Sequence, residues 1–206
     1  SIANTPPSVN SVQIIPNNGI VNSDTIQCTA TAVDPDEIPI IRYEWRAQQG
    51  PSAITVGLGP IIALNPTLIK PGQMLTCRAI ATDSDGAENT SEAVVAIDNR
   101  SPMIIGPSII PASPHNNDEL LCDFLSTDPD GDLLVETIVW TNEDRGTILG
   151  ISQLLTLDSS LAMPGETIRC QVNLSDPLGM TETAYTEATL SNRDPTLTSL
   201  TITPQF

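Results

Sequence analysis

The sequence predicts an all-β protein built from two similar β-sandwich domains in series. Three observations lead to this prediction. Apolar and polar residues alternate along short segments, which is the pattern of half-buried strands. Turn-forming residues interrupt these segments often, and no window has a convincing helical period. The third observation is an order of cysteine, tryptophan and cysteine that occurs once in each half of the 206-residue chain.

The repeat divides the chain into two domains of ordinary size. Each half is long enough to bury its own core. A short motif of Asn, two variable or polar residues and Pro opens each copy, at residues 4–7, 99–102 and 192–195. We therefore expect a first domain over residues 1–98, a second over 99–191, and a linker with the first strand of a truncated third repeat over 192–206.

The alternating residues indicate about seven short strands in each domain. In the first domain they are Ile26, Cys28, Ala30 and Ala32; Ile41, Tyr43 and Trp45; and Leu75, Cys77, Ala79 and Ala81. In the second they are Leu120, Cys122 and Phe124; Ile138 and Trp140; and Ile168, Cys170, Val172 and Leu174. Each set falls on one face of its strand, so these residues are the expected core.

The four cysteines form two matched pairs, 49 and 48 residues apart. A zinc site is the competing interpretation, but the chain has no Cys-x-x-Cys and a single histidine, His115. We expect disulfides Cys28–Cys77 and Cys122–Cys170, each stabilising its domain by about 4 kcal/mol in the chain-entropy model. Disulfides imply an oxidising compartment, here extracellular or at the cell surface.

The charge balance excludes several classes of partner. The chain has 25 acidic and 8 basic residues and a net charge of −17. Nucleic acids and anionic membranes require clustered Lys and Arg, so neither is an expected partner. No apolar run reaches the ~18 residues of a membrane span. No secretory signal is present at Ser1, and we expect Ser1 to lie within a longer precursor.

A cysteine on an early strand, a tryptophan on the next and a second cysteine late in the domain resembles the immunoglobulin fold. The closest resemblance is to the Ig-like and PKD-like tandem repeats of bacterial cell-surface proteins. Those repeats carry Asp-Pro-Asp-Gly-Asp after strand B and Asp-x-x-Gly after strand F, as here at 128–132 and 176–179. The resemblance implies a tryptophan packed against a disulfide that joins two sheets. One departure is that Leu75 and Ile168 replace the tyrosine of antibody-type domains.

In this fold the B–C and F–G loops emerge at the end where the linker enters, so their carboxylates would converge there. Like charges this close repel unless a cation lies between them. Asp-x-Asp-Gly-Asp also matches the alternating oxygen ligands of calcium loops. The arrangement resembles the calcium linkers of cadherin-type arrays and predicts calcium at the junction. The expected ligands are Asp98, Asn99, Asp128, Asp130, Asp132 and Asp176.

A second, weaker calcium site is predicted in the matching loops of the first domain. Glu37-Ile-Pro replaces Gly-Asp there, and the preceding domain that would complete the site is absent from the sequence. The alternative for both sites is that Asp, Pro and Gly simply form turns. The weaker set is Asp34, Asp36, Glu37, Asp83 and Asp85.

The sequence favours a non-catalytic structural role. His115 lies in a turn away from any candidate nucleophile, and no nucleophile or phosphate-loop motif is present. We expect a segment of a stalk, fibre or surface array whose partners are neighbouring repeats of the same chain. The alternatives are an adhesion module that binds other copies, a protein or a glycan on a host or cell surface, and an accessory domain of a secreted hydrolase. The apolar Leu197, Leu200 and Ile202 would be disordered or would attach to a neighbour's sheet edge, unless the sequence is simply cut a few residues late.

Overall fold

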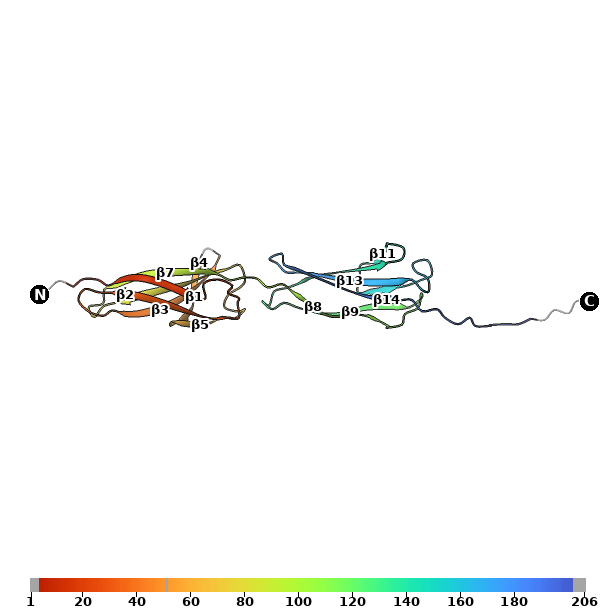
Figure 1. Cartoon of the computed structure of the whole chain (residues 1–206), viewed down its shortest axis with the longest axis horizontal. Helices are drawn as coiled ribbons and strands as arrows, with labels where there is room; N and C mark the ends of the chain where they lie inside the picture. The colour runs from red at the N-terminus through yellow and green to blue at the C-terminus, as the bar shows by residue number, and fades with distance from the viewer. Residues whose placement is uncertain (1–3, 51, 202–206) are drawn as a thin grey trace, which may run out of the picture. The chain divides into compact units, whose positions relative to one another are not determined.

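A computed structural model of the chain describes residues 4–50 and 52–201. The chain divides into two compact units (Figure 1). The first comprises Ser1–Ser101 together with Asp128–Asp132, and the second comprises Pro102–Thr127 and Leu133–Phe206. Every element in the described residues is a strand, and none of them forms a helix that could span a membrane.

The first unit is a sandwich of two antiparallel sheets. One sheet has three strands in the order β1-β2-β5, and the other has four in the order β4-β3-β6-β7. The strands are β1 (Ser8–Ile15), β2 (Thr25–Val33), β3 (Ile40–Gln49), β4 (Ser52–Leu58), β5 (Ile61–Ala63), β6 (Met74–Thr82) and β7 (Glu88–Ala96).

The second unit repeats this topology. Its three-stranded sheet has the order β12-β9-β8, and its four-stranded sheet has the order β11-β10-β13-β14. The strands are β8 (Met103–Ile110), β9 (Glu119–Thr127), β10 (Val135–Asn142), β11 (Thr147–Gly150), β12 (Leu154–Thr156), β13 (Thr167–Ser175) and β14 (Thr181–Thr189). The predicted tandem of Ig-like sandwiches is therefore confirmed.

The core follows from the alternation of apolar residues. Along β6 and β13 every second residue is buried, so one face of each strand lies against the opposite sheet. A one-residue shift in register would turn these residues to solvent, so burial fixes the pairing of both strands. On β13 the buried residues are Ile168, Cys170, Val172 and Leu174.

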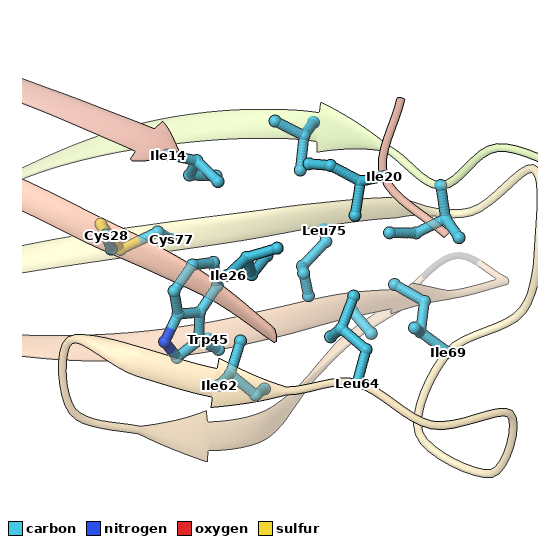
Figure 2. Packing of buried hydrophobic residues seen from close by; sticks show 13 residues of the cluster. Ile14, Ile20, Ile26, Cys28, Trp45, Ile62, Leu64, Ile69, Leu75 and Cys77 are labelled. Carbon is cyan, nitrogen blue, oxygen red and sulfur yellow. A yellow bond between two sulfur atoms is a disulfide. The ribbon is translucent and has the colours of Figure 1, made fainter. Parts of the chain in front are cut away.

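Each core is centred on a disulfide and a tryptophan. Cys28 on β2 is bonded to Cys77 on β6, so the bond joins the two sheets. Figure 2 shows this disulfide in one cluster with the buried indole ring of Trp45 and with Ile26. The indole Nε1 donates to the Gly59 carbonyl at 2.9 Å, so the only polar atom of the ring is satisfied.

The second sandwich has the same core arrangement. Cys122 on β9 is bonded to Cys170 on β13, and Trp140 is fully buried in the same cluster. Its Nε1 donates to the Ser152 carbonyl at 2.8 Å. Both predicted disulfides, and the predicted packing of a tryptophan with each, are confirmed.

A glycine lets the strand after each tryptophan approach the core closely. Trp45 pairs with Gly57 and Trp140 pairs with Gly150, and the register shifts directly after each pair. A Cβ at Gly57 would lie 2.8 Å from Ile62 Cδ1, and a Cβ at Gly150 would lie 3.2 Å from Leu155 Cδ1. These two positions therefore favour glycine because of space, at a bulge beside each tryptophan.

The departure from the antibody pattern has a physical reason. Leu75 and Ile168, two residues before the second cysteines, are both fully buried in the apolar cores, where a tyrosine hydroxyl would need a partner. The first sandwich instead places Tyr43 on β3, where its hydroxyl accepts the Ala30 amide of β2 at 3.2 Å. The tyrosine thus links the two sheets from another strand.

The segment after β14 forms no strand between Leu190 and Thr201 within the described residues. Leu197 and Leu200 are 81% and 78% exposed. The third apolar residue of the predicted strand, Ile202, lies outside the described residues. The predicted pairing of this segment with a neighbouring sheet edge stays a prediction.

The second sandwich has one carboxylate that the first lacks at the equivalent place. Glu166, just before β13, accepts hydrogen bonds from Arg145 Nε, the Met163 amide and Asn142 Nδ2, each at 2.8 Å. These bonds lower the pKa of Glu166 from 4.5 to about 2, and the bond from Arg145 has the largest effect. In the first sandwich Gln73 takes this position, and its Oε1 accepts the Lys70 amide at 2.8 Å.

This difference predicts a loss of stability at low pH that only the second sandwich has at this position. A carboxyl whose pKa is lowered by folding stabilises the fold above its unfolded pKa and loses that contribution as pH falls through the folded pKa. We therefore expect the thermal midpoint of the second sandwich to fall between pH 4.5 and about 2, and Glu166→Gln to reduce that fall. Calorimetry from pH 7 to pH 2 measures this. The midpoint of the first sandwich, which has Gln73 at this position, is expected to be the same in the parent chain and the variant at each pH. An equally steep fall in the variant would contradict the assignment.

Candidate functional site

The acidic loops of the first sandwich bind amide N–H groups of their own unit. Asp34 Oδ1 accepts the amides of Asp36 at 2.7 Å and Glu37 at 3.3 Å, which closes the turn between β2 and β3. Asp36 Oδ2 accepts the Thr5 amide at 3.0 Å, and Glu37 Oε1 accepts the Ser84 amide. This turn therefore connects the start of the chain to two loops of the sandwich.

Asp83 has a similar structural role at the turn between β6 and β7. Its Oδ1 accepts the Ala87 amide at 2.7 Å, and its Oδ2 accepts Asn4 Nδ2 at 2.9 Å. The hydrogen bond from Asn4 is the main reason that the pKa of Asp83 lies below its usual value. Asp85, the last residue of the weaker predicted calcium set, is exposed.

The segment Asp128–Asp132, here called the acidic loop, lies between β9 and β10 in sequence and belongs to the first compact unit. Asp128 Oδ1 accepts the amides of Asp130 at 2.7 Å and Asp132 at 3.3 Å, as Asp34 does in the first repeat. Gly131 has a φ of +73°, a conformation that favours glycine. The Asp-Pro-Asp-Gly pattern is thus a turn with its own internal hydrogen bonds.

Asp130 is fully buried and pairs with Arg100. Its Oδ2 accepts the Arg100 amide at 2.6 Å, and its Oδ1 accepts Arg100 Nε at 2.8 Å. Arg100 Nη2 lies 2.7 Å from the same Oδ1 and also donates to the Pro129 carbonyl at 2.6 Å. Both oxygens of Asp130 are therefore satisfied by one residue, whose positive charge offsets the cost of burying the carboxylate.

Two further residues of the first unit hold the acidic loop. Asn22, also fully buried, donates through Nδ2 to the Asp130 carbonyl at 3.0 Å, and its Oδ1 accepts Arg100 Nη2 at 3.0 Å. Lys70 Nζ lies 3.4 Å from the Gly131 carbonyl oxygen and 3.8 Å from Asp132 Oδ1. Arg100 and Asn22 were not predicted as site residues, although Arg100 directly follows the predicted ligand Asn99.

The remaining predicted ligands have different environments. The Asp98 amide donates to the Ile20 carbonyl at 2.7 Å and its side chain is exposed, whereas Asn99 is half-buried. Asp176 is buried in the second unit, where its Oδ1 accepts the amides of Leu178 at 2.8 Å and Met180 at 2.9 Å. Asp176 thus closes the turn between β13 and β14.

The six predicted ligands of the main site are divided between the two units, with Asp176 in the second and the others in the first, and their role as one calcium site stays a prediction. Calcium takes six to eight oxygen ligands. No three His, Cys, Asp or Glu residues among residues 4–50 and 52–201 are placed to hold a metal ion together. Asp130 is unsuited as a ligand, because Arg100 binds both of its oxygens and would repel a second cation. Asp128 Oδ2 and Asp34 Oδ2 are buried without a hydrogen-bond partner. Each of these two oxygens could therefore serve as a metal ligand, one in each loop.

The single histidine is placed in a turn of the second sandwich. The His115 amide donates to Asp118 Oδ2 at 2.8 Å, and its Nδ1 lies 3.3 Å from the same oxygen. Arg193 Nη2 donates to Asp118 Oδ1 at 3.0 Å. The hydrogen bond from the His115 amide is the largest of several effects that lower the pKa of Asp118. This arrangement fixes a turn.

No protein-family model matches the chain, and no curated protein matches it. Three solved structures illustrate the similarity that does exist. Three N-terminal domains of the Hoc outer capsid protein of bacteriophage RB49 are 12% identical, with a TM-score of 0.36, over 91% of this chain and 71% of that one. A 1.5-MDa bacterial ice-binding adhesin is 12% identical, with a TM-score of 0.35, over 92% of this chain and 66% of that one.

Cadherin domains 1–5 of protocadherin gamma B2 are 12% identical, with a TM-score of 0.35, over 92% of this chain and 41% of that one. The chain thus spans less than two thirds of the length of the last two proteins. Similarity this low carries no functional argument. The assignment of two Ig-like sandwiches therefore rests on the sheet order, the disulfides and the buried tryptophans of the chain itself.

Proposed function

We propose that the chain is a non-catalytic, extracellular structural repeat, a segment of a stalk, fibre or surface array. The observation that supports this most is a contact made twice on matching residues. The linker amides of Thr5 and Arg100 donate to Asp36 Oδ2 at 3.0 Å and to Asp130 Oδ2 at 2.6 Å. A repeated spacer needs its linker held in the same way each time, and these bonds do that.

We further propose residues 1–98 and 99–191 as the repeating units and residues 192–206 as the start of a third. Each linker begins with the same backbone bond, from the Asp98 amide to the Ile20 carbonyl and from the Ser191 amide to the Pro114 carbonyl, both at 2.7 Å. The two disulfides support an oxidising, extracellular or surface location. The resemblance to PKD-like repeats stays a prediction.

Small-angle scattering tests the structural role. The chain is compared with a longer one in which residues 4–191 occur twice in series, so that Ser191 is followed by Asn4. If the linkers restrict bending, the radius of gyration is expected to rise about twofold. Freely jointed units would give a rise of about 1.4-fold, the square-root scaling of a flexible chain. A ratio near the lower value would contradict the stalk proposal.

Calcium stiffening of the junction stays a prediction from the sequence, and a comparison with and without calcium tests it. Its structural support is the buried Asp128 Oδ2, which has no hydrogen-bond partner, and the opposing observation is the Arg100 guanidinium on Asp130. The scattering profile and the thermal midpoint are measured in calcium and then in excess chelator. Because Arg100 already neutralises Asp130, we expect both quantities to be nearly unchanged. A rise in midpoint with calcium that Asp128→Asn abolishes would establish a metal site.

An adhesion role is the second candidate, favoured by one pocket of the first sandwich. The pocket has a volume of about 540 Å³, and Ile41, Leu58, Pro60 and Ile80 contribute apolar groups to it. Leu58 is 76% exposed. The matching residues of the second sandwich include the polar Glu136 and Asn173 in place of Ile41 and Ile80. A pocket whose apolar lining is not repeated in the second sandwich suits a binding role better than a spacer role, which makes it the place to probe for a ligand.

A further inference from the structure

The segment that leaves the second sandwich makes the same backbone hydrogen bond as the segment that leaves the first. The Ser191 amide donates to the Pro114 carbonyl as the Asp98 amide donates to the Ile20 carbonyl. Two residues after each of these amides the chain carries an arginine, Arg100 in the first linker and Arg193 in the second. Arg193 therefore stands at the end of the second sandwich where Arg100 stands at the end of the first.

In the first unit this position binds a specific loop. Arg100 pairs with the fully buried Asp130 through its backbone amide and its guanidinium, and Asn22 donates to the Asp130 carbonyl at 3.0 Å. Arg100 Nη2 also donates to Asn22 Oδ1 at 3.0 Å. The two residues therefore act together, one on the carboxylate and one on the backbone of the same aspartate.

The second unit carries the matching pair. Asn116 lies two residues before Asp118, as Asn22 lies two residues before Asp24, and it is half-buried where Asn22 is fully buried. The side chain of Arg193 is 46% exposed, compared with 32% for Arg100. Its guanidinium donates to Asp118 Oδ1 at 3.0 Å, a partly exposed carboxylate of its own sandwich.

We propose that Asn116 and Arg193 form a docking surface for the Asp-Pro-Asp turn of a following Ig-like repeat, with the second aspartate of that turn bound by Arg193 as Asp130 is bound by Arg100. This inference rests on the proposed role as a repeat in an array and names the loop chemistry of its next neighbour. Charge complementarity supports it. The chain has 8 basic residues against 25 acidic ones, and an arginine recurs at the same place in the second and third linker motifs.

The surface at Arg193 differs from the one at Arg100 in one respect, which determines which residues the partner turn must contain. Met163 and Ser159 replace Lys70 and Pro66, the residues that lie beside Gly131 and Asp132 in the first unit. At the second surface, the Gly-Asp half of a bound turn would therefore lack the contacts that Lys70 and Pro66 make in the first unit. We therefore expect the partner turn to require Asp-Pro-Asp and to tolerate other residues after it, as in the first repeat, where Glu37-Ile follows Asp36.

The test uses a chain with a third sandwich, made by joining residues 103–191 again after Pro195. Amide hydrogen exchange at Arg193 is measured by NMR, with Arg100 in the same molecule as the reference. We expect exchange at Arg193 to be at least about tenfold slower than in the 206-residue chain, because its amide gains a charge-assisted hydrogen bond. Asp130→Asn in the added sandwich is expected to weaken that protection, whereas Asp123→Asn, at an exposed position on β9, is not.

Two results would overturn the proposal. Fast exchange at Arg193 beside slow exchange at Arg100 would show that the second surface does not bind the turn, and would leave the structural role to the scattering test. The second result is slow exchange at Arg193 already in the 206-residue chain, with the protection disappearing when the protein is diluted. That result would assign the surface to the loop of a second molecule. Protection that requires the third sandwich and its Asp130 supports the proposal.

Discussion

Replacing Trp140 with alanine is expected to destabilise the second sandwich by about 3–5 kcal/mol, as large-to-small core substitutions of aromatic residues do. The side chain is fully buried in the cluster that contains Cys122 and Cys170. The substitution leaves a cavity beside the disulfide and removes the indole N–H from the Ser152 carbonyl. A domain of this size holds about 5–15 kcal/mol in total, so much of its stability would be lost.

Calorimetry of the whole chain measures this effect, with the first sandwich and its Trp45 as the internal reference. At about 4–8 °C per kcal/mol for a domain of 60–100 residues, the midpoint of the second sandwich is expected to fall by roughly 12 °C or more. Trp140→Phe is the matched control, since it keeps most of the apolar volume and loses the hydrogen bond, at a cost of about 1–2 kcal/mol. Equal midpoints for Trp140→Ala and the parent chain would show that the indole is not central to the core.

Removing the second disulfide is expected to have a comparable effect. Cys122 and Cys170 are 48 residues apart, and closing a loop of that length stabilises the fold by about 4 kcal/mol in the chain-entropy model. The double variant Cys122→Ala/Cys170→Ala should therefore lower the midpoint of the second sandwich alone. The bond joins β9 to β13 and hence one sheet to the other. Without it, the two sheets of the second sandwich can also separate more easily.

The equivalent variant Cys28→Ala/Cys77→Ala provides the matched control, because its loop of 49 residues predicts nearly the same loss in the first sandwich. A reducing agent added to the parent chain should reproduce both shifts at once. If reduction changed the midpoint of only one sandwich, the two bonds would not contribute equally and the loop-length account would be wrong.

The fold could be predicted from the sequence because its signals are local and occur twice. Alternation along β6 and β13 follows directly from the side-chain period of a strand. The cysteine pairs could be matched because the second copy repeats the spacing of the first. The sheet order could only be reached by resemblance, since the place of short strands such as β5 (Ile61–Ala63) depends on contacts far apart in sequence.

The candidate site was less predictable for a physical reason. Converging carboxylates require positive charge, and the sequence pattern of Asp and Gly suggested calcium as its source. Near Asp130 the charge comes from Arg100, thirty residues away in the chain, and an arginine beside an aspartate in space leaves no spacing signal. Asn22 was missed because a buried asparagine that bonds a loop backbone has no sequence pattern of its own. The turn-forming interpretation of Asp34 and Asp128 agrees with their hydrogen bonds.

The pairing of Asp130 with Arg100 has a consequence for the surroundings in which such a protein can work. A guanidinium that belongs to the polypeptide cannot diffuse away, so its effective concentration beside the carboxylate is the same in any fluid. A bound divalent ion, by contrast, dissociates once its level in the medium drops below the dissociation constant. The acidic loop would therefore stay in place in ion-poor water and in body fluids alike. Because Asp130 is fully buried, added salt would screen its pairing with Arg100 only weakly.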